Sequence, residues 1–384
     1  MRKPKDGGQP CPNPDCSYYR LLHRGNMSAI ATYLPQSGKR RIFRCSKCEG
    51  TFSETRDTVF FDLRTPEEKV MMALKMLLVK VALSDIGFVL GVTEETVLEW
   101  LRRAAQKAHE VKAHLLCDLP VTQVQLDEMW SFIRRKHAQQ AGLAGESIEG
   151  SEEGRQWVWI SFAPEFRLIL AAFVGPRTFN SALQLIPMTA AVVLGVPCFF
   201  SDGFSCYLSA LLEVYHTLKT FPRTRKPGRP RQPIKEPRPE LVYGPGIKKT
   251  RQGRLQELVY RVCCGPKRLE ELGLSISTSL IERLNLTLRH ALAPLVRKSW
   301  SFCKDRTQMR RRVVVLQAFY NFARPHMSLS LPLPAPEPHH WGCIQTKWCH
   351  RTPGMAAGLT DHVWTFRELL TAKFEPIHNQ SGSG

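Results

Sequence analysis

The sequence predicts a multidomain α/β protein in which two small modules precede an α/β domain with a mixed sheet and flanking helices. Three observations support this. Cysteines are paired near the N-terminus, the apolar period is helical over about 65–117, and strand-like alternation begins at Val121. The expected regions are 1–64, 65–117, 118–326 with a basic insertion at 222–275, and a C-terminal extension at 327–384.

The N-terminal region has the spacing of a zinc ribbon. Cys11 and Cys16 form one pair, Cys45 and Cys48 form a second, and the run Lys39–Arg44 between them is strand-like. Four thiolates bind one structural zinc and allow a segment too small for its own core to fold. Four buried free cysteines are the alternative, but their pairing in a Pro- and Lys-rich segment favours zinc.

A helical region follows at residue 65. Thr65 predicts an N-cap, Pro66 a first helical residue and Glu68 a capping box, for a helix that continues to about Val81. The short helix Ser84–Leu90, a turn at 91–92 and a longer helix over 93–109 have helix-turn-helix spacing, with Val92 placed to pack on Val97.

A helix-turn-helix of this kind predicts DNA contacts, although a plain three-helix bundle is the alternative. Exposed Arg102, Arg103 and Lys107 suit phosphate groups. The start of the longer helix lies where a recognition helix meets base edges, and it comprises Thr93, Glu94, Glu95 and Thr96.

The third region has the element order of a ribonuclease-H-like domain. Three adjacent strands come first, and helices and strands then alternate. The expected strands are Val121–Ile133, Trp157–Phe162, Leu168–Val174, Pro197–Ser201 and His216–Phe221, and the expected helices are Asn180–Val193 and Cys206–Val214. The connection 137–154 is Gly-, Ala-, Ser- and Glu-rich and predicts a surface loop.

The segment 222–240 predicts an exposed basic arm, because its prolines cannot continue a sheet. Gly228-Arg229-Pro230 resembles the centre of an AT-hook, but Pro227 stands where an Arg normally precedes the Gly, so a solvated linker is favoured. The cations offered for DNA contact are Arg225, Lys226, Arg229 and Arg231.

The charge distribution supports a nucleic-acid partner. The 384 residues include 54 Lys and Arg against 34 Asp and Glu, a formal net charge of +20, and 43% are hydrophobic. This composition excludes global disorder. The positive charge is concentrated in 1–50, 221–268 and 283–326, and three such blocks favour contact with a phosphate backbone, although a solvated loop could explain any one of them.

The sequence predicts neither a membrane span nor a secretory signal. The most apolar stretch, Ala182–Phe200, contains Pro187 and Pro197, which break a helix, and the basic start Met1–Lys5 precedes no apolar segment. We therefore expect a cytoplasmic, nucleoid-associated protein with no membrane partner and with reduced cysteines.

Three carboxylates predict a divalent-metal site. Asp127 lies in the first strand, Asp202 follows the fourth, and Glu282 lies on a helix expected over 279–293. A charge that interrupts an apolar strand is costly, and paired Mg²⁺ ions held by carboxylates support phosphodiester cleavage. Glu128 competes with Asp127 for this role.

The strings Q-L-D-E-M-W, S-D-G-F and I-E-R-L-N-L-T-L-R-H-A-L-A-P-L-V-R-K-S-W-S-F, with the ending Y-N-F-A-R-P-H at 320–326, resemble the DDE transposases of bacterial insertion sequences. The resemblance is greatest to the insertion-sequence-one type and covers about residues 8–326. It implies that Asp127, Asp202 and Glu282 form the catalytic triad. The cofactors would be Mg²⁺, two ions per site and replaceable by Mn²⁺, and one structural Zn²⁺.

The implied function is a DNA transposase that binds terminal inverted repeats, cleaves at the transposon end and transfers the freed 3′ hydroxyl to target DNA. The partners are double-stranded DNA and further copies of the chain, in a dimer or larger assembly. Supporting contacts are expected from Asn285, Arg289, Arg297 and Lys298. The alternatives are a zinc-ribbon and helix-turn-helix regulator, which the triad opposes, and a structure-specific nuclease, which would cut without joining.

Further expectations concern aromatic and C-terminal residues. Trp130 and Trp300 are assigned to the core in preference to base stacking. Residues 327–338 predict an extended segment and Thr360–Ala372 a helix. The spacing of the His and Cys residues within 339–350 matches no closed metal site. The final Ser-Gly-Ser-Gly is typical of a linker scar.

Overall fold

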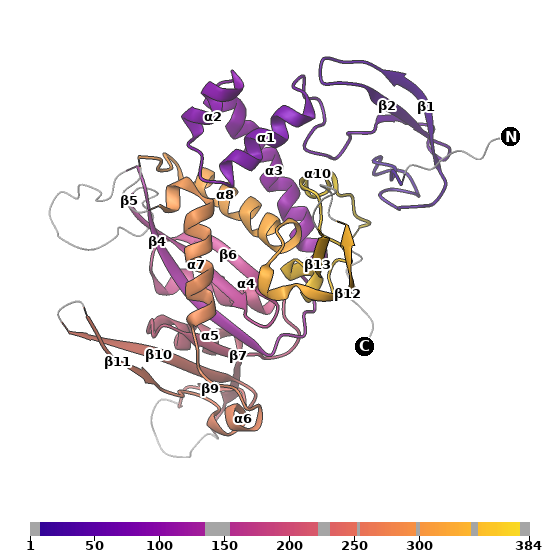
Figure 1. Ribbon diagram of the computed structural model, residues 1–384. Helices are drawn as coiled ribbons and strands as arrows, with labels where there is room; N and C mark the ends of the chain where they lie inside the picture. Colours follow the sequence, from indigo (N-terminus) through magenta and orange to yellow (C-terminus); the bar gives the residue numbers. More distant parts are fainter. Residues whose placement is uncertain are drawn as a thin grey trace.

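The computed structural model describes residues 8–134, 154–221, 231–251, 254–296, 300–338 and 345–376. A small N-terminal module and three helices lie over one end of a central sheet domain, and the C-terminal segment returns to both (Figure 1). The predicted loop 137–154, except Gly154, lies outside the described residues, as do the final Ser-Gly-Ser-Gly and much of the 339–350 cluster. Within the described ranges, no helix is both long and apolar enough to cross a bilayer.

The N-terminal module is an antiparallel three-stranded sheet with a core of its own. Its strands β1 (Met27–Tyr33), β2 (Arg40–Cys45) and β3 (Thr51–Ser53) pair in that order. The predicted basic run becomes β2. The buried side chains of the module form a cluster separate from the main core, and they are Cys11, Cys16, Met27, Phe43 and Cys45.

The helical module contains α1 (Glu67–Leu77), α2 (Leu83–Leu90) and α3 (Glu94–Leu115). The turn between α2 and α3 depends on Gly91, whose φ of 59° lies in the left-handed region that glycine adopts readily. Thr93 caps α3, because its hydroxyl accepts the Thr96 N–H at 3.2 Å. The short helix and the turn therefore form where the sequence predicts them, but the longer helix continues past the expected end at 109 to Leu115.

The predicted N-cap of α1 is wrong. Pro66 is the N-cap, with φ −55° and ψ 142°, and no side chain caps the helix. Glu67 is buried and pairs with Arg40 and with Arg367. The helix also ends at Leu77 and not near Val81, and Lys80 beyond it has a φ of 70°.

The central sheet is mixed and six-stranded, in the order β11-β10-β7-β4-β5-β6. Neighbours β4–β5 and β5–β6 are antiparallel, and β7 lies parallel to both β4 and β10. The strand bounds are β4 Gln123–Ile133, β5 Gly154–Ala163, β6 Leu168–Gly175, β7 Cys198–Ser201, β10 Val242–Arg251 and β11 Arg254–Tyr260. The flanking helices are α4 Phe179–Ala190, α5 Cys206–Val214, α7 Ser279–Ala291 and α8 Arg306–Ala318. The predicted mixed α/β architecture is confirmed.

The predicted fifth strand of this sheet is wrong. Residues 216–219 form β8 (His216–Lys219), which pairs with β9 (Ile234–Pro237) in a separate two-stranded sheet. The position beside β7 belongs to β10, where Val242 pairs with Cys198. Val242 is fully buried, whereas most of β8 is exposed, so burial of apolar surface favours β10 as the inner strand.

The C-terminal extension contains short elements. β12 (Leu331–Pro338) pairs with β13 (Gln345–Cys349), which confirms the extended segment at 327–338 in part. The predicted helix 360–372 is wrong in length, because a capping box between Thr365 and Glu368 starts α10 (Phe366–Thr371) late. The other elements are α6 Pro266–Glu271, η1 Ala293–Leu295, η2 Phe319–Ala323, η3 Met327–Leu329 and α9 Pro353–Ala356.

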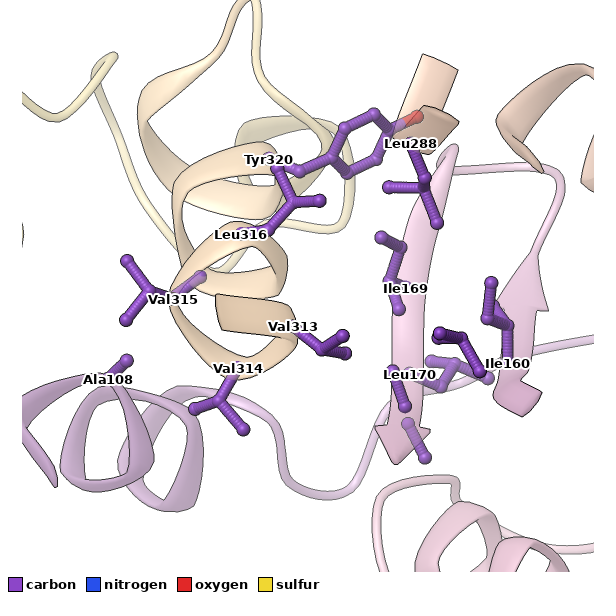
Figure 2. Packing of buried hydrophobic residues seen from close by; sticks show 14 of the residues in the cluster. Ala108, Ile160, Ile169, Leu170, Leu288, Val313, Val314, Val315, Leu316 and Tyr320 are labelled. Atoms are coloured by element: carbon purple, nitrogen blue, oxygen red, sulfur yellow. The ribbon is translucent and has the colours of Figure 1, made fainter. Parts of the chain in front are cut away.

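Helix α8 joins the helical module to the central sheet. Figure 2 shows Val314 and Val315 facing Ala108 of α3, while Val313 faces Ile169 and Leu170 of β6. One continuous hydrophobic core therefore runs from α1 through α8 into the sheet.

The outer strand β6 is also bound by side-chain amides from the end of α8 and from η2. Asn321 accepts the Ile169 N–H at 3.0 Å and donates to the Ile169 carbonyl at 2.9 Å. Gln317 donates to the carbonyls of Ile169 and Leu170. Both amide side chains are buried, so they satisfy strand backbone groups at this edge.

Candidate functional site

Two carboxylates meet where β7 ends beside β4. Leu126 pairs with Ser201 across these parallel strands, so the next residues, Asp127 and Asp202, are neighbours. Together with Glu128 they form a cluster in which one carboxylate oxygen of each residue lies within 4.8 Å of the others. This concentration of negative charge is unfavourable unless cations or protons offset it.

Asp127 is held by two donors and is hard to ionise. Its Oδ2 accepts a hydrogen bond from Asn285 Nδ2 at 2.6 Å, and its Oδ1 accepts the Glu128 N–H at 2.8 Å. Burial raises the pKa of Asp127 to about 7, and repulsion from Asp202, Glu128 and Glu282 acts in the same direction. The site therefore favours a proton or a cation at this carboxylate.

Glu128 belongs to the same cluster but has different partners from Asp127. Its carboxylate accepts hydrogen bonds from Tyr207 Oη on α5 at 2.8 Å and from Arg177 Nε at 2.6 Å. Burial and Asp202 raise the pKa of Glu128 to about 7, although Arg177 and Tyr207 oppose this shift. Glu128 is thus paired with a cationic side chain, whereas Asp127 is bound by the neutral Asn285 amide of α7.

Helix α7 carries the remaining predicted residues. The Ile281 N–H donates to Gln125 Oε1 at 2.8 Å, which fixes the start of α7 against β4. Glu282 accepts the Thr278 hydroxyl at 3.2 Å, and it lies outside the 4.8 Å cluster but close enough to raise the pKa of Asp127. The structure thus brings Asp127 and Asp202 together and places Glu282 beside them on a neighbouring helix.

Asn285 and Arg289 have distinct partners. Asn285 binds Asp127 and not Glu282, and Arg289 donates to the Leu295 carbonyl at 3.4 Å. The Asn285 Oδ1 atom is buried, and it has no hydrogen-bond partner among the residues that the structure describes. An unsatisfied carbonyl oxygen beside two carboxylates is a donor set that fits a hard cation such as Mg²⁺ or Mn²⁺.

The four cysteines of the N-terminal module converge as their spacing predicts. Their four sulfur atoms, those of Cys11, Cys16, Cys45 and Cys48, all lie within 4.8 Å of one another. Burial opposes ionisation of Cys45, but hydrogen bonds from the Cys48 backbone and the Asn26 amide lower its pKa to about 6. A pre-formed thiolate among three further thiols fits a structural zinc ion.

The predicted exposure of the phosphate contacts on α3 is wrong for Lys107 and only partly met by Arg103. Arg102 is exposed but paired with Glu99, and Arg103 binds both Glu99 and the Phe61 carbonyl. Lys107 is only 5% exposed and contacts Glu110 and the Ala372 carbonyl. The expectation of an exposed Lys107 is therefore wrong, because the C-terminal segment covers this part of α3.

The predicted base-reading residues lie at the start of α3. The hydroxyl groups of Thr93 and Thr96 lie 3.1 Å apart, and Glu94 is 4.0 Å from Lys304. Glu95 is exposed.

Of the other predicted DNA contacts, only Arg231 falls within the described residues. Arg231 lies over the Phe221 ring at 4.1 Å. Outside the described residues are Arg225, Lys226, Arg229, Arg297 and Lys298.

Of the two tryptophans assigned to the core, only one is partly buried. Trp130 is half-buried and packs on Phe132, with ring centroids 5.6 Å apart. Trp300 is 97% exposed, so its assignment to the core is wrong. Its apolar character alone did not reveal this exposure.

Sequence reasoning also missed the partners of Glu128. Arg177 follows β6 and Tyr207 lies on α5, and nothing in their local pattern marks either one. The available signal was Glu128 itself, since a carboxylate in an apolar strand requires a counter-charge or donors.

No protein-family model and no curated protein sequence matches the chain. Solved structures that resemble it include the Mos1 transposase paired-end complex with left transposon end, at 13% identity and a TM-score of 0.15. That match covers 38% of this chain and 56% of the transposase chain. The Mos1 strand transfer complex matches at the same identity and TM-score, over 36% of this chain and 52% of the other. Likenesses this distant do not establish the fold or activity of this protein.

Proposed function

We propose that this protein is a DDE-type DNA transposase that binds the terminal inverted repeats of an insertion sequence and carries out metal-dependent strand cleavage and strand transfer. The observation that carries this proposal is the meeting of Asp127 on β4 with Asp202 directly after the parallel strand β7, with Glu282 nearby on α7, the helix that packs on β4. Carboxylates gathered in this way suit divalent-metal phosphoryl-transfer chemistry.

In this proposal Asp127, Asp202 and Glu282 would hold Mg²⁺ or Mn²⁺, with the Asn285 carbonyl oxygen as a further donor. Such ions supply a polarised phosphate and an activated attacking oxygen when bound. Asn285 orients the Asp127 carboxylate through its 2.6 Å hydrogen bond. The cluster of charges keeps a DNA phosphate away until cations are present, so chemistry is coupled to metal loading.

The remaining regions would supply DNA binding. The α2–α3 pair would read base edges with Thr93, Glu95 and Thr96, and Arg102 would contact phosphate. The basic residues around β8–β11 and the zinc-ribbon module would add sequence-independent attraction. Further copies of the chain would bring two transposon ends together.

A strand-transfer assay tests the proposal. The substrate is a labelled duplex carrying the inverted repeats that flank the coding sequence, incubated with target plasmid and Mg²⁺. We expect cleavage at the repeat end followed by joining to the plasmid, and neither product with Asp202→Asn. Cutting without joining would indicate a nuclease, and binding without cutting would indicate a regulator. Either result would overturn the proposal.

A further inference from the structure

Arg177 has a fixed position at the edge of the carboxylate cluster. It follows β6 and directly precedes Thr178, the N-cap of α4. The Trp159 indole N–H donates to the Pro176 carbonyl at 3.2 Å, and the Thr178 hydroxyl accepts the Ser181 N–H at 3.4 Å. The backbone on both sides of Arg177 is therefore anchored.

The guanidinium group is also held in one orientation. It lies over the Trp157 ring at 5.1 Å and over the Phe204 ring at 4.4 Å. Its Nε donates to Glu128 Oε1 at 2.6 Å, and Nη2 pairs with the same oxygen. Two aromatic contacts and a charged hydrogen bond leave little rotational freedom to lose on binding a ligand.

One edge of this guanidinium faces inward and another faces solvent. The Glu128 side chain is 1% exposed, whereas that of Arg177 is 38% exposed. Within the described part of the chain, Nη1 of Arg177 has no hydrogen-bond partner. The pairing with Glu128 therefore uses only part of a planar group that carries five N–H donors.

The guanidinium contacts the loop that carries Asp202. Phe204, which stacks on Arg177, donates its N–H to Asp202 Oδ1 at 3.4 Å. Any phosphate brought to the carboxylates approaches a strongly negative cluster, and a fixed cation beside it offsets that repulsion.

We infer that Arg177 is a phosphate-contacting residue, which binds a DNA backbone phosphate adjacent to the Asp127 and Asp202 carboxylates. This inference rests on the proposed function and assigns a substrate contact to a residue outside the predicted triad. The planar guanidinium matches the geometry of phosphate oxygens, so lysine would be a poor replacement.

The competing role for Arg177 is that of a counter-ion for buried Glu128 alone. The two roles differ in the double variant Glu128→Gln with Arg177→Gln, because removing both charges leaves no unpaired buried ion. Arg177→Gln alone should lower the unfolding midpoint by at least about 5 °C, since Glu128 loses its cation. The double variant should recover most of that loss.

DNA binding then separates the roles. The matched pair is the double variant against Glu128→Gln, since these differ only at residue 177. Fluorescence anisotropy on the inverted-repeat duplex in Mg²⁺ should show about tenfold weaker binding by the double variant. The slope of log affinity against log salt should be shallower by about 0.9, as expected for one lost phosphate contact. Arg177→Lys keeps a positive charge, so it should keep the wild-type slope of log affinity against log salt but bind the duplex more weakly than the wild-type protein.

Lys347→Gln on β13 removes an exposed cation from a separate two-stranded sheet and should leave binding unchanged. If the double variant binds with the affinity and slope of Glu128→Gln, Arg177 is only a counter-ion and the inference is overturned. If the wild-type protein neither binds nor cleaves the duplex, the proposed function fails together with the inference, so the two failures are distinguishable.

Discussion

The zinc-ribbon module and the carboxylate end of the central sheet both gather metal-ligating residues from distant parts of the chain, but they rely on packing to different degrees. The module has a small core of its own, and three of the buried residues in that core are cysteines of the four-cysteine cluster. Asp127 and Asp202 instead lie on strands of a sheet embedded in the main core. We therefore expect the first site to depend on a bound ion for its fold, whereas the backbone of the second site is held by packing of the sheet.

Metal removal should consequently have effects of very different size at the two sites. Without zinc, the module loses the bonds that replace a hydrophobic core. Without Mg²⁺, the sheet remains and only charge repulsion among Asp127, Glu128 and Asp202 is left. The predictions below test this contrast.

The largest effect is expected from Cys45→Ser. This change removes the thiolate whose pKa is lowered to about 6, and structural zinc sites contribute on the order of 10–16 kcal/mol. We expect loss of one zinc per chain by metal analysis and rapid proteolysis within residues 8–55, while the central domain stays folded. Cys117→Ser, at an exposed cysteine outside the cluster, is the control. Retention of zinc by Cys45→Ser would contradict the assignment.

Asp202→Asn should abolish chemistry while preserving the fold. Loss of a metal-binding carboxylate should slow strand cleavage by at least about 10³-fold, equivalent to about 4 kcal/mol. The unfolding midpoint in EDTA should rise, because one charge leaves a repulsive cluster. Gel-based cleavage and thermal unfolding measure the two effects. Glu270→Gln, an exposed carboxylate on α6, should change neither. A lower midpoint for Asp202→Asn would contradict our account of the metal-free site.

Glu67→Gln tests how the zinc-ribbon module is attached to the rest of the chain. Glu67 has an 8% exposed side chain and pairs with Arg40 of β2 and Arg367 of α10. Breaking a buried pair costs about 3 kcal/mol, so the free energy of unfolding should fall by that amount in urea denaturation. Glu68→Gln, the exposed neighbour, should change it by less than about 0.5 kcal/mol. Equal effects of the two substitutions would show that the buried pair contributes nothing.

The smallest effect concerns pH. Burial and the neighbouring carboxylates raise the pKa of Asp127 to about 7, above the ordinary value of 3.8. The folded state then binds the extra proton between these values, so the contribution to stability is full below about pH 4 and is lost as the pH rises through about 7. In EDTA, the unfolding midpoint of the wild-type protein should fall by a few degrees relative to Asp127→Asn between pH 5 and 8. A rising difference over that window would contradict the shift.

Local signals in the sequence predicted those elements that depend on local interactions. Cysteine spacing located the four-cysteine cluster, the turn at 91–92 located the start of α3, and alternation located β4 to β6. The residue types of the carboxylate cluster were also visible, because charge inside an apolar strand is costly. These predictions needed no knowledge of distant contacts.

Features that depend on non-local pairing were not predictable from pattern. The strand β10 pairs with β7 across more than 40 intervening residues, and a Pro-rich segment interrupts the pattern between them. Lys107 is buried by the Ala372 region, which is 265 residues away in sequence. The position of Arg177 is fixed by Glu128 and by two aromatic rings, and all three are distant from it in sequence, so no local pattern predicts its role.

The amides of Gln317 and Asn321 also occupy backbone groups of an outer strand. An outer strand with free backbone groups is a template for another chain and a route to aggregation. In β6, backbone groups of Ile169 and Leu170 are already hydrogen-bonded to side chains from α8 and η2. The assembly proposed on DNA would therefore form without extending the sheet through β6, and loss of the Asn321 amide would open a route to insoluble protein.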